Sequence, residues 1–181
     1  NGTVTANSGS LTMSAAGAET LTLNGSALYD LTVAGAGTIT FSESTAAVGN
    51  DVLVYAGTLV LPGSTLTVGG SWVNNSTISP LTGTVLFNST DTGETIDLGS
   101  SSLHNMTFGS ALGGWNVVAN ATTTASTTLT SGTFTLDPGI VLSVGGVFTN
   151  TIGGASTTWA GSTLSLENGT YDINRKTDAG D

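Results

Sequence analysis

The sequence predicts an all-β protein built as a β-solenoid, in which the chain winds into stacked coils of short strands. Three observations lead to this fold class. Valine, leucine and isoleucine alternate with threonine and serine, as on a pleated, half-buried strand surface, and no stretch shows helical spacing. Turn signals rich in glycine and asparagine recur at short intervals. The chain also repeats itself over a long period.

The expected strands are short and closely spaced. Turn residues at 24–25, 35–37, 49–50 and 69–70 separate runs such as TLTL, LTV, TITF, VLVY, TLVL, TLTV and TVLF. With 38% hydrophobic residues and only 3 prolines, the chain has enough apolar side chains for a core and is not a polyproline linker. Such strands suit coils that each contact only their neighbours and together bury one continuous core.

Two matched pairs of segments define the long repeat. GTLVLPGSTLTVGGSWVN at 57–74 returns as GTFTLDPGIVLSVGGVFTN at 132–150, and AETLTLNGSALYDLTV at 18–33 returns as GETIDLGSSSLHNMTF at 93–108. Equivalent residues are 75 or 76 positions apart. The predicted organisation is a partial unit, two full units and a polar tail, at 1–27, 28–102, 103–177 and 178–181.

The repeat length also sets the expected coil length. At about 25 residues per coil, a unit would form about three coils and the chain about seven. Two small β-sandwiches in tandem are the alternative. A unit of about 75 residues is short beside the roughly 100 residues of an immunoglobulin-type sandwich, and the chain has no cysteine for that fold's Cys–Trp–Cys pattern. The solenoid is therefore favoured.

The charge balance excludes several classes of partner. The chain has 12 acidic residues and only 2 basic ones, which are adjacent at Arg175 and Lys176. A protein that binds the phosphate backbone needs several Lys or Arg contacts, so nucleic acid is not an expected partner. Binding to an anionic membrane surface is not expected either, because it also requires several basic residues. No apolar run approaches the roughly 20 residues of a membrane span, so no membrane insertion is expected from this segment.

Three stretches, LYDLTV, LTVGGSWVNNSTI and LTGTVLFNST, resemble the β-strand-repeat segments of very long secreted bacterial surface proteins. The order of the elements agrees with that family over nearly the whole chain. The resemblance implies an exported protein that forms an adhesin-like stalk or a surface layer, and it carries over no catalytic residues.

The expected function is a non-catalytic, extracellular structural or adhesive segment of a cell-surface or filament-forming protein. Exposed end coils present unpaired strand edges, so end-to-end self-association of such segments is expected. Three alternatives remain open: a carbohydrate-binding module that recognises surface glycans, an ice-binding solenoid and a polysaccharide-active enzyme. No cofactor is expected, except that Ca²⁺ binding at an acidic segment is left open.

The densest acidic group is DTGETIDLG, which contains Asp91, Glu94 and Asp97. Two carboxylates at a suitable separation could hydrolyse a glycosidic bond. The other copy of the repeat carries Ala16 and Thr22 at two of the three aligned positions. A solvated turn is therefore the favoured interpretation, with a weak Ca²⁺ site as a further alternative, because hard cations prefer oxygen ligands.

A second candidate Ca²⁺ site lies in YDINRKTDAGD near the end of the chain. Asp172, Asn174, Asp178 and Asp181 approach the spacing of a calcium-binding loop. The sixth loop position, where a sharp turn requires glycine, is Thr177. A polar terminus without a metal is the simpler interpretation.

The three tryptophans, Trp72, Trp115 and Trp159, could form a platform on which sugar rings stack. Trp72 alternates with Val68 and aligns with Phe148 in the next copy of the repeat, as a stacked core position would. A core role is therefore favoured over a carbohydrate-binding surface.

Thr-x-Thr runs raise the ice-binding alternative, because outward threonines in constant register on a flat solenoid face can match an ice lattice. Their uneven spacing along the sequence argues against it. The runs are Thr3/Thr5, Thr20/Thr22, Thr38/Thr40, Thr65/Thr67 and Thr133/Thr135.

Asn-x-Ser/Thr sequons mark exposed turns that would carry glycans if the host glycosylates asparagine, which would make the protein a glycoprotein. Otherwise they are ordinary turn residues. The candidate glycosylation sites are Asn24, Asn74, Asn75, Asn88, Asn105, Asn120 and Asn168.

Overall fold

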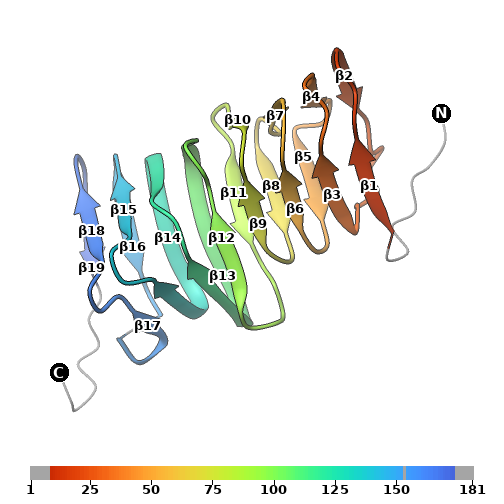
Figure 1. The fold of residues 1–181 in the computed structure, drawn as a ribbon. Helices are drawn as coiled ribbons and strands as arrows, with labels where there is room; N and C mark the ends of the chain where they lie inside the picture. Colours follow the sequence, from red (N-terminus) through yellow and green to blue (C-terminus); the bar gives the residue numbers. More distant parts are fainter. Residues whose placement is uncertain (1–8, 153, 174–181) are drawn as a thin grey trace.

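The computed structural model describes residues 9–152 and 154–173 as one stack of short strands, with no α-helix in these ranges. Every strand pair described is parallel, and each joins strands from successive coils. Figure 1 shows the strands side by side in rows along the long axis. The predicted β-solenoid is confirmed. The tandem-sandwich alternative is wrong, because its strands would pair mainly as antiparallel neighbours.

Each coil passes over three faces, named A, B and C in the order in which the chain visits them. The long strands β13 (Leu103–Val117) and β14 (Ala121–Leu136) turn corners and contribute to more than one face. Face A comprises β1 (Ser10–Met13), β3 (Asp30–Val33), β6 (Val52–Val54), β9 (Trp72–Asn74), β12 (Glu94–Asp97), the ends of β13 and β14, and β17 (Thr157–Thr158), which follows the 3-10 turn η1 (Gly154–Ser156). Face B comprises β2 (Ala18–Leu21), β4 (Thr38–Phe41), β7 (Thr58–Val60), β10 (Thr77–Ser79), the start of β14, β15 (Val141–Val144) and β18 (Thr163–Leu166). Face C comprises β5 (Thr45–Val48), β8 (Thr65–Val68), β11 (Thr84–Phe87), middle parts of β13 and β14, β16 (Val147–Asn150) and β19 (Tyr171–Ile173).

The coils are shorter and more numerous than the sequence predicted. Val52 pairs with Trp72, 20 residues further on, and Trp72 pairs with Ile96, 24 residues further on. The predicted coil length of about 25 residues is therefore close to that of the longer coils, and other coils are shorter. The described chain forms about eight coils, not seven.

The 75-residue repeat does not correspond to a whole number of coils. Trp72 lies in β9 on face A, whereas its sequence counterpart Phe148 lies in β16 on face C. Leu31 on face A and Met106 on face C are separated in the same way. The matched residues share an inward-facing position but not a face, so 28–102 and 103–177 are not structurally equivalent units.

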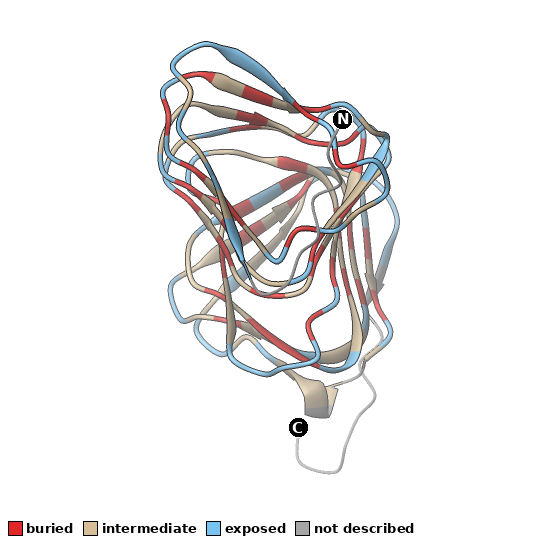
Figure 2. Ribbon diagram, turned by 90° about the vertical axis from the view of Figure 1, so that its right-hand side faces the viewer, coloured by how far each residue is buried: buried red, intermediate tan, exposed pale blue. Residues whose placement is uncertain are grey.

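The core follows from strict alternation along the strands. In β3, β4, β8 and β11 the second and fourth residues are buried and the first and third are half-buried. Parallel register then stacks the buried residues of successive coils into columns, such as Leu31, Val52, Trp72 and Ile96 on face A. Figure 2 shows the buried segments recurring around a common interior.

Aromatic rings fill the middle of this core. Phe108 is fully buried and stacks on Phe87 with ring centroids 4.9 Å apart. Its ring also contacts those of Phe134 at 5.0 Å and Trp115 at 5.3 Å. Trp72 extends the cluster through an edge contact with Phe87 at 6.2 Å. The cluster joins faces A and C across the interior.

Glycine is required where coils approach each other closely at the corners. A Cβ atom added at Gly69 would lie 2.2 Å from the carbonyl oxygen of Gly49 in the preceding coil. Gly57 has a φ of 72°, and an added Cβ there would lie 2.2 Å from the carbonyl oxygen of Gly37. The glycine signals in the sequence therefore mark tight corners of the stack.

Candidate functional site

Residues of the acidic group at 91–97 form hydrogen bonds to the neighbouring coil. The two carboxylate oxygens of Glu94 accept hydrogen bonds from the Ser71 hydroxyl at 2.7 Å and the Ser89 hydroxyl at 3.1 Å. Ser71 belongs to the preceding coil, and its hydroxyl in turn accepts the Thr95 N–H at 3.0 Å. Asp97 accepts the N–H of Gly99 at 2.8 Å. This arrangement favours a structural role over glycoside hydrolysis.

The same corner carries further carboxylates whose role the sequence did not reveal. Asp30 accepts hydrogen bonds from the Asn50 side chain at 2.8 Å and from the Asp51 N–H at 3.2 Å. Asp51 then accepts the N–H of Ser71 at 2.8 Å. Together with Glu94, these residues form a line of bonds between coils along the start of face A, which we call the acidic corner. Only the coil register brings them together.

A hollow of about 160 Å³ lies near this corner but contains no charged side chain. Its lining includes Trp115, Asn116, Thr133 and Thr135. Neither Asp91 nor Glu94 lines it, so it lacks the carboxylates that glycoside hydrolysis would need.

The candidate Ca²⁺ site near the end of the chain is only partly described. Asp172 lies in β19, where it pairs with Thr149 of β16. Asn174, Asp178 and Asp181 lie outside the described residues. Within residues 9–152 and 154–173, no group of three or more His, Cys, Asp or Glu side chains could hold a metal ion.

The three tryptophans do not form a surface platform. Trp72 is completely buried and Trp115 is 2% exposed, so the carbohydrate-stacking hypothesis is wrong for both rings. Trp159 is half-buried and contacts the buried ring of Phe148 at 6.2 Å. Alternation with core residues, already visible around Trp72, correctly indicated its inward orientation.

The Thr-x-Thr runs do not form one rank. Thr38/Thr40 lies on face B, Thr65/Thr67 on face C and Thr133/Thr135 at the face A end of β14. Thr20 belongs to β2, but Thr22 lies beyond its end, and Thr3/Thr5 falls outside the described residues. These runs therefore provide no flat, two-column threonine array for an ice lattice.

The candidate glycosylation sites comprise one core position, one half-buried strand position and five exposed positions. Asn74 is completely buried, and its amide donates to the Leu98 carbonyl at 2.8 Å and the Ser101 hydroxyl at 3.2 Å. Its oxygen accepts the Ser76 N–H at 3.0 Å, so Asn74 cannot carry a glycan in the folded chain. Asn105 is half-buried and bonded to Ser126. The exposed sequon asparagines are Asn24, Asn75, Asn88, Asn120 and Asn168.

Replacing Asn74 by alanine is expected to lower the free energy of unfolding by about 1–3 kcal/mol, because it removes three hydrogen bonds and leaves buried groups unpaired. The neighbouring Asn75→Ala change is the control, because Asn75 is exposed and should shift stability by no more than about 0.5 kcal/mol. Urea denaturation followed by tryptophan fluorescence measures both. Equal effects of the two changes would contradict the structural role of Asn74.

Glu43 holds an irregular turn at the beginning of face C. Its carboxylate accepts the N–H groups of Leu23 and Asn24 at 2.6 and 2.8 Å, and a hydrogen bond from the Ser42 hydroxyl at 3.0 Å. The bond from the Asn24 backbone, followed by those from Leu23 and Ser42, holds the pKa of Glu43 below its ordinary value. The charged carboxylate therefore stabilises the turn.

This pKa shift predicts a pH dependence of local stability. A carboxyl group with a lowered folded-state pKa contributes its stabilisation above the unfolded pKa, and the contribution is lost as the pH falls through the folded-state value. Protection of the Asn24 amide against hydrogen exchange should therefore decline as the pH is lowered below the ordinary glutamate range. Glu43→Gln should show reduced protection already at neutral pH and a flatter pH profile. An unchanged profile would contradict this role of Glu43.

Comparison of the chain with protein-family models, with curated proteins and with solved structures finds no match. Among the described residues, no helix is long and apolar enough to cross a membrane. The geometry above is therefore the basis for a functional proposal.

Proposed function

We propose that this chain is a non-catalytic structural segment that acts as a rod-like spacer in an extracellular, cell-surface or filament-forming protein. The observation that carries the proposal is the single apolar core running through about eight parallel coils. At about 4.8 Å per strand, eight stacked strands extend for about 35 Å along the axis. Each further coil would lengthen such a rod without a new kind of core.

The use of the polar side chains supports the same role. Asp30 and Asp51 of the acidic corner accept hydrogen bonds from the next coil, and the buried Asn74 bridges to Leu98 and Ser101 in the following coil. Candidate catalytic residue Glu94 is part of this bonding. These hydrogen bonds join each coil to its neighbours, which a structural spacer requires. The extracellular location rests on the resemblance to secreted surface proteins.

End-to-end association is part of this proposal. The first strands, β1 and β2, and the last strands of faces B and C, β18 and β19, each have a neighbour on one edge only among the described residues. Apolar side chains of the core are partly uncovered at both ends, with Leu11 and Met13 at one and Leu164 and Leu166 at the other. A second copy could therefore continue both the ladders and the core.

Electron microscopy and light scattering of the purified segment test the proposal. Rod-shaped particles that lengthen with protein concentration are expected. Immunogold labelling of intact source cells should place the protein on the outer surface. Monomers that remain globular at high concentration would contradict end-to-end association, and turnover of a polysaccharide by the pure chain would contradict the non-catalytic role.

A further inference from the structure

Face C has a gap in its ladder beside β5. Strand β5 pairs with β8 over all four of its residues on one edge. On the other edge the place of a strand belongs to residues 25–28 of the first described coil, but only Leu28 pairs there, in an isolated bridge with Val48. At this bridge the Leu28 N–H donates to the Ala47 carbonyl at 3.0 Å, and the Gly49 N–H donates to the Leu28 carbonyl at 2.7 Å.

The gap does not come from a missing or an added residue. Before the gap Leu21 pairs with Phe41, and after it Leu28 pairs with Val48, so both pairs are 20 positions apart. The first coil therefore has as many residues between these pairs as the second coil has. The stretch between them could pair with β5 throughout without any change in register.

The first coil leaves the ladder over residues 24–27, which we call the strap. Its first two residues have φ values of 52° and 79°, which are left-handed rather than extended. The N–H of Ser26 donates to the Leu23 carbonyl at 3.0 Å and closes a turn. The core residues that flank the strap, Leu23 and Leu28, are each 2% exposed, so both of its ends are fixed.

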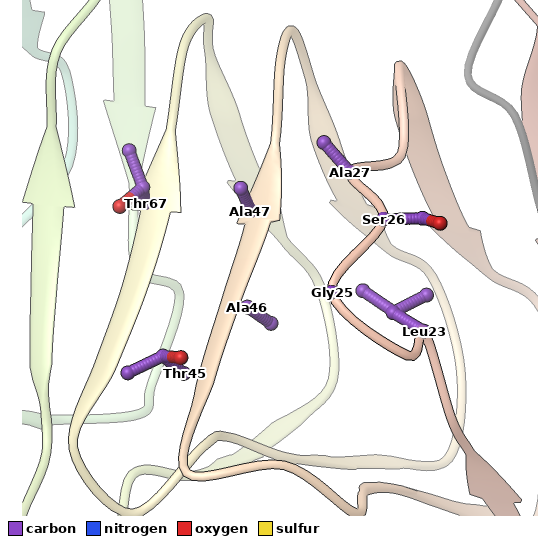
Figure 3. A pocket seen from close by; sticks show the side chains of 8 residues that line it. All are labelled: Leu23, Gly25, Ser26, Ala27, Thr45, Ala46, Ala47 and Thr67. Carbon is purple, nitrogen blue, oxygen red and sulfur yellow. The ribbon is translucent and has the colours of Figure 1, made fainter.

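A hollow of about 270 Å³ separates the strap from β5, and we call it the notch. Figure 3 shows Thr45, Ala46 and Ala47 on one side of it and the turn that carries the strap on the other. Ala46 is half-buried, whereas the next residue in the same inward column, Leu66, is 1% exposed. The notch thus occupies space that a regular strand would fill.

The backbone of β5 is already oriented to pair with the strap. Backbone groups alternate in direction along a strand with a period of two, so the Thr45 carbonyl and the Ala47 N–H point to the same edge as the Ala47 carbonyl. Continuing the register of the Leu28 bridge places Ser26 between them. The Ser26 N–H would then donate to Thr45 instead of Leu23. The Ala47 N–H would gain the Ser26 carbonyl as an acceptor.

Glu43 holds the strap away from this edge. Its Oε1 accepts the Leu23 and Asn24 N–H groups at 2.6 and 2.8 Å, and its Oε2 accepts the Ser42 hydroxyl at 3.0 Å. These bonds fix the turn at the start of the strap. The Glu43 carboxylate therefore stabilises the open arrangement.

We propose that the strap is a two-state element, which Glu43 holds open in its charged form and which pairs with β5 as a parallel strand when that charge is lost. Closing places Ser26 beside Ala46 in the inward column of face C and fills the notch. It also completes the third face of the first coil, next to β1 on face A and β2 on face B. A proton shifts this equilibrium because it binds more tightly to a carboxylate that no longer accepts these hydrogen bonds.

The direction of the pH dependence follows from the hydrogen bonds to Glu43. The bond from the Asn24 backbone, followed by those from Leu23 and Ser42, holds the pKa of Glu43 below its ordinary value. Stabilisation of the open strap is therefore present above the ordinary glutamate pKa and is lost as the pH falls through the lowered value. The corners packed against Glu43, at 22–24 in the preceding coil and 62–64 in the following one, contain no titratable side chain that would change this direction.

Amide hydrogen exchange distinguishes closing of the strap from simple loss of the turn. Below the ordinary glutamate range, the protection factor of the Ala47 amide should rise while that of the Asn24 amide falls. The rise should reach about tenfold once the strap is closed about 90% of the time. Glu43→Gln should show the same pattern at neutral pH, because its side chain carries no charge.

Gly25→Val should raise the protection of Ala47 at neutral pH by a different route. A β-branched residue is disfavoured at the φ of 79° that Gly25 has in the open strap, and it favours an extended strand. Gly63→Val is the matched control, because Gly63 lies at a corresponding corner, has no left-handed φ and has open space where a Cβ would lie. This control should leave Ala47 protection at the wild-type level.

Circular dichroism of each sample checks that the stack remains folded. Ala47 protection that stays at its neutral wild-type level in acid, in Glu43→Gln and in Gly25→Val would overturn the proposal. A loss of protection at both Asn24 and Ala47 in acid would overturn it as well, because the first coil would then melt instead of closing.

Discussion

Replacing Phe108 by alanine is expected to lower the free energy of unfolding by about 3–5 kcal/mol, the range found for deleting a large buried aromatic side chain. Phe108 is fully buried and contacts the rings of Phe87, Phe134 and Trp115. Its removal leaves a cavity where faces A and C meet. Since a domain has a total stability of only about 5–15 kcal/mol, the variant should be close to unfolding at room temperature.

Leu112→Ala in the same long strand is the matched control. Leu112 is 69% exposed, so its truncation should change the free energy of unfolding by about 0.5 kcal/mol or less. Urea denaturation, followed by the fluorescence of the buried tryptophans, compares the two variants. Similar midpoints for Phe108→Ala and Leu112→Ala would show that the aromatic cluster does not hold the stack together.

A lysine placed at Leu66 is expected to prevent folding or to cost about 4 kcal/mol or more, whereas a lysine at the adjacent Thr65 should cost about 0.5 kcal/mol. Leu66 is 1% exposed and lies in an inward column between Ala46 and Val85. An unpaired ammonium group there would lose its hydration without gaining a partner. Thr65 points outward on the same strand, where a lysine side chain remains in water.

Circular dichroism and urea denaturation of Leu66→Lys and Thr65→Lys measure this difference. Because the two residues are neighbours, any difference reports the direction of the side chains rather than the location in the chain. Equal tolerance of both substitutions would mean that face C does not have the inward and outward sides described here.

The fold class could be predicted from the sequence because alternation and turn spacing are local properties. The pattern of TLTV in β8 already separates inward leucine and valine from outward threonine. The same alternation in TVLF of β11 puts Val85 and Phe87 inward, with Thr84 and Leu86 outward. The paired glycines at 69–70 correctly marked a corner. Such features depend only on the period of two along a strand and on tight turns.

The length of a coil could not be obtained in the same way. The strongest sequence similarity, which aligns Trp72 with Phe148, joins positions on different faces, so it misled the assignment of equivalent units. Segments of similar sequence can form a strand and the following corner on face A or on face C, because the strands of both faces alternate inward and outward side chains in the same way. Which residues pair between successive coils depends on contacts 20 or more positions apart, and the spacing of turn residues in one sequence does not determine these pairs.

The polar contacts were the least predictable part. Asn74 and Asn75 are adjacent sequon asparagines, yet one is buried and bonded to the next coil and the other is exposed. Asp30, Asp51 and Glu94 form the acidic corner only because successive coils place them in line. Their separation in sequence gave no sign of this arrangement.

Distances between spin labels along face C test the central claim most directly. Register places Ala47, Thr67, Leu86, Thr107, Thr128 and Thr149 in one outward column. Labels at 47 and 128 should be separated by four strand steps, or about 19 Å, and labels at 47 and 149 by five steps, or about 24 Å. Electron paramagnetic resonance on the two double-cysteine variants should therefore give two distances of this size, the second longer by one step. A 47–149 distance equal to or shorter than the 47–128 distance would contradict the parallel stack.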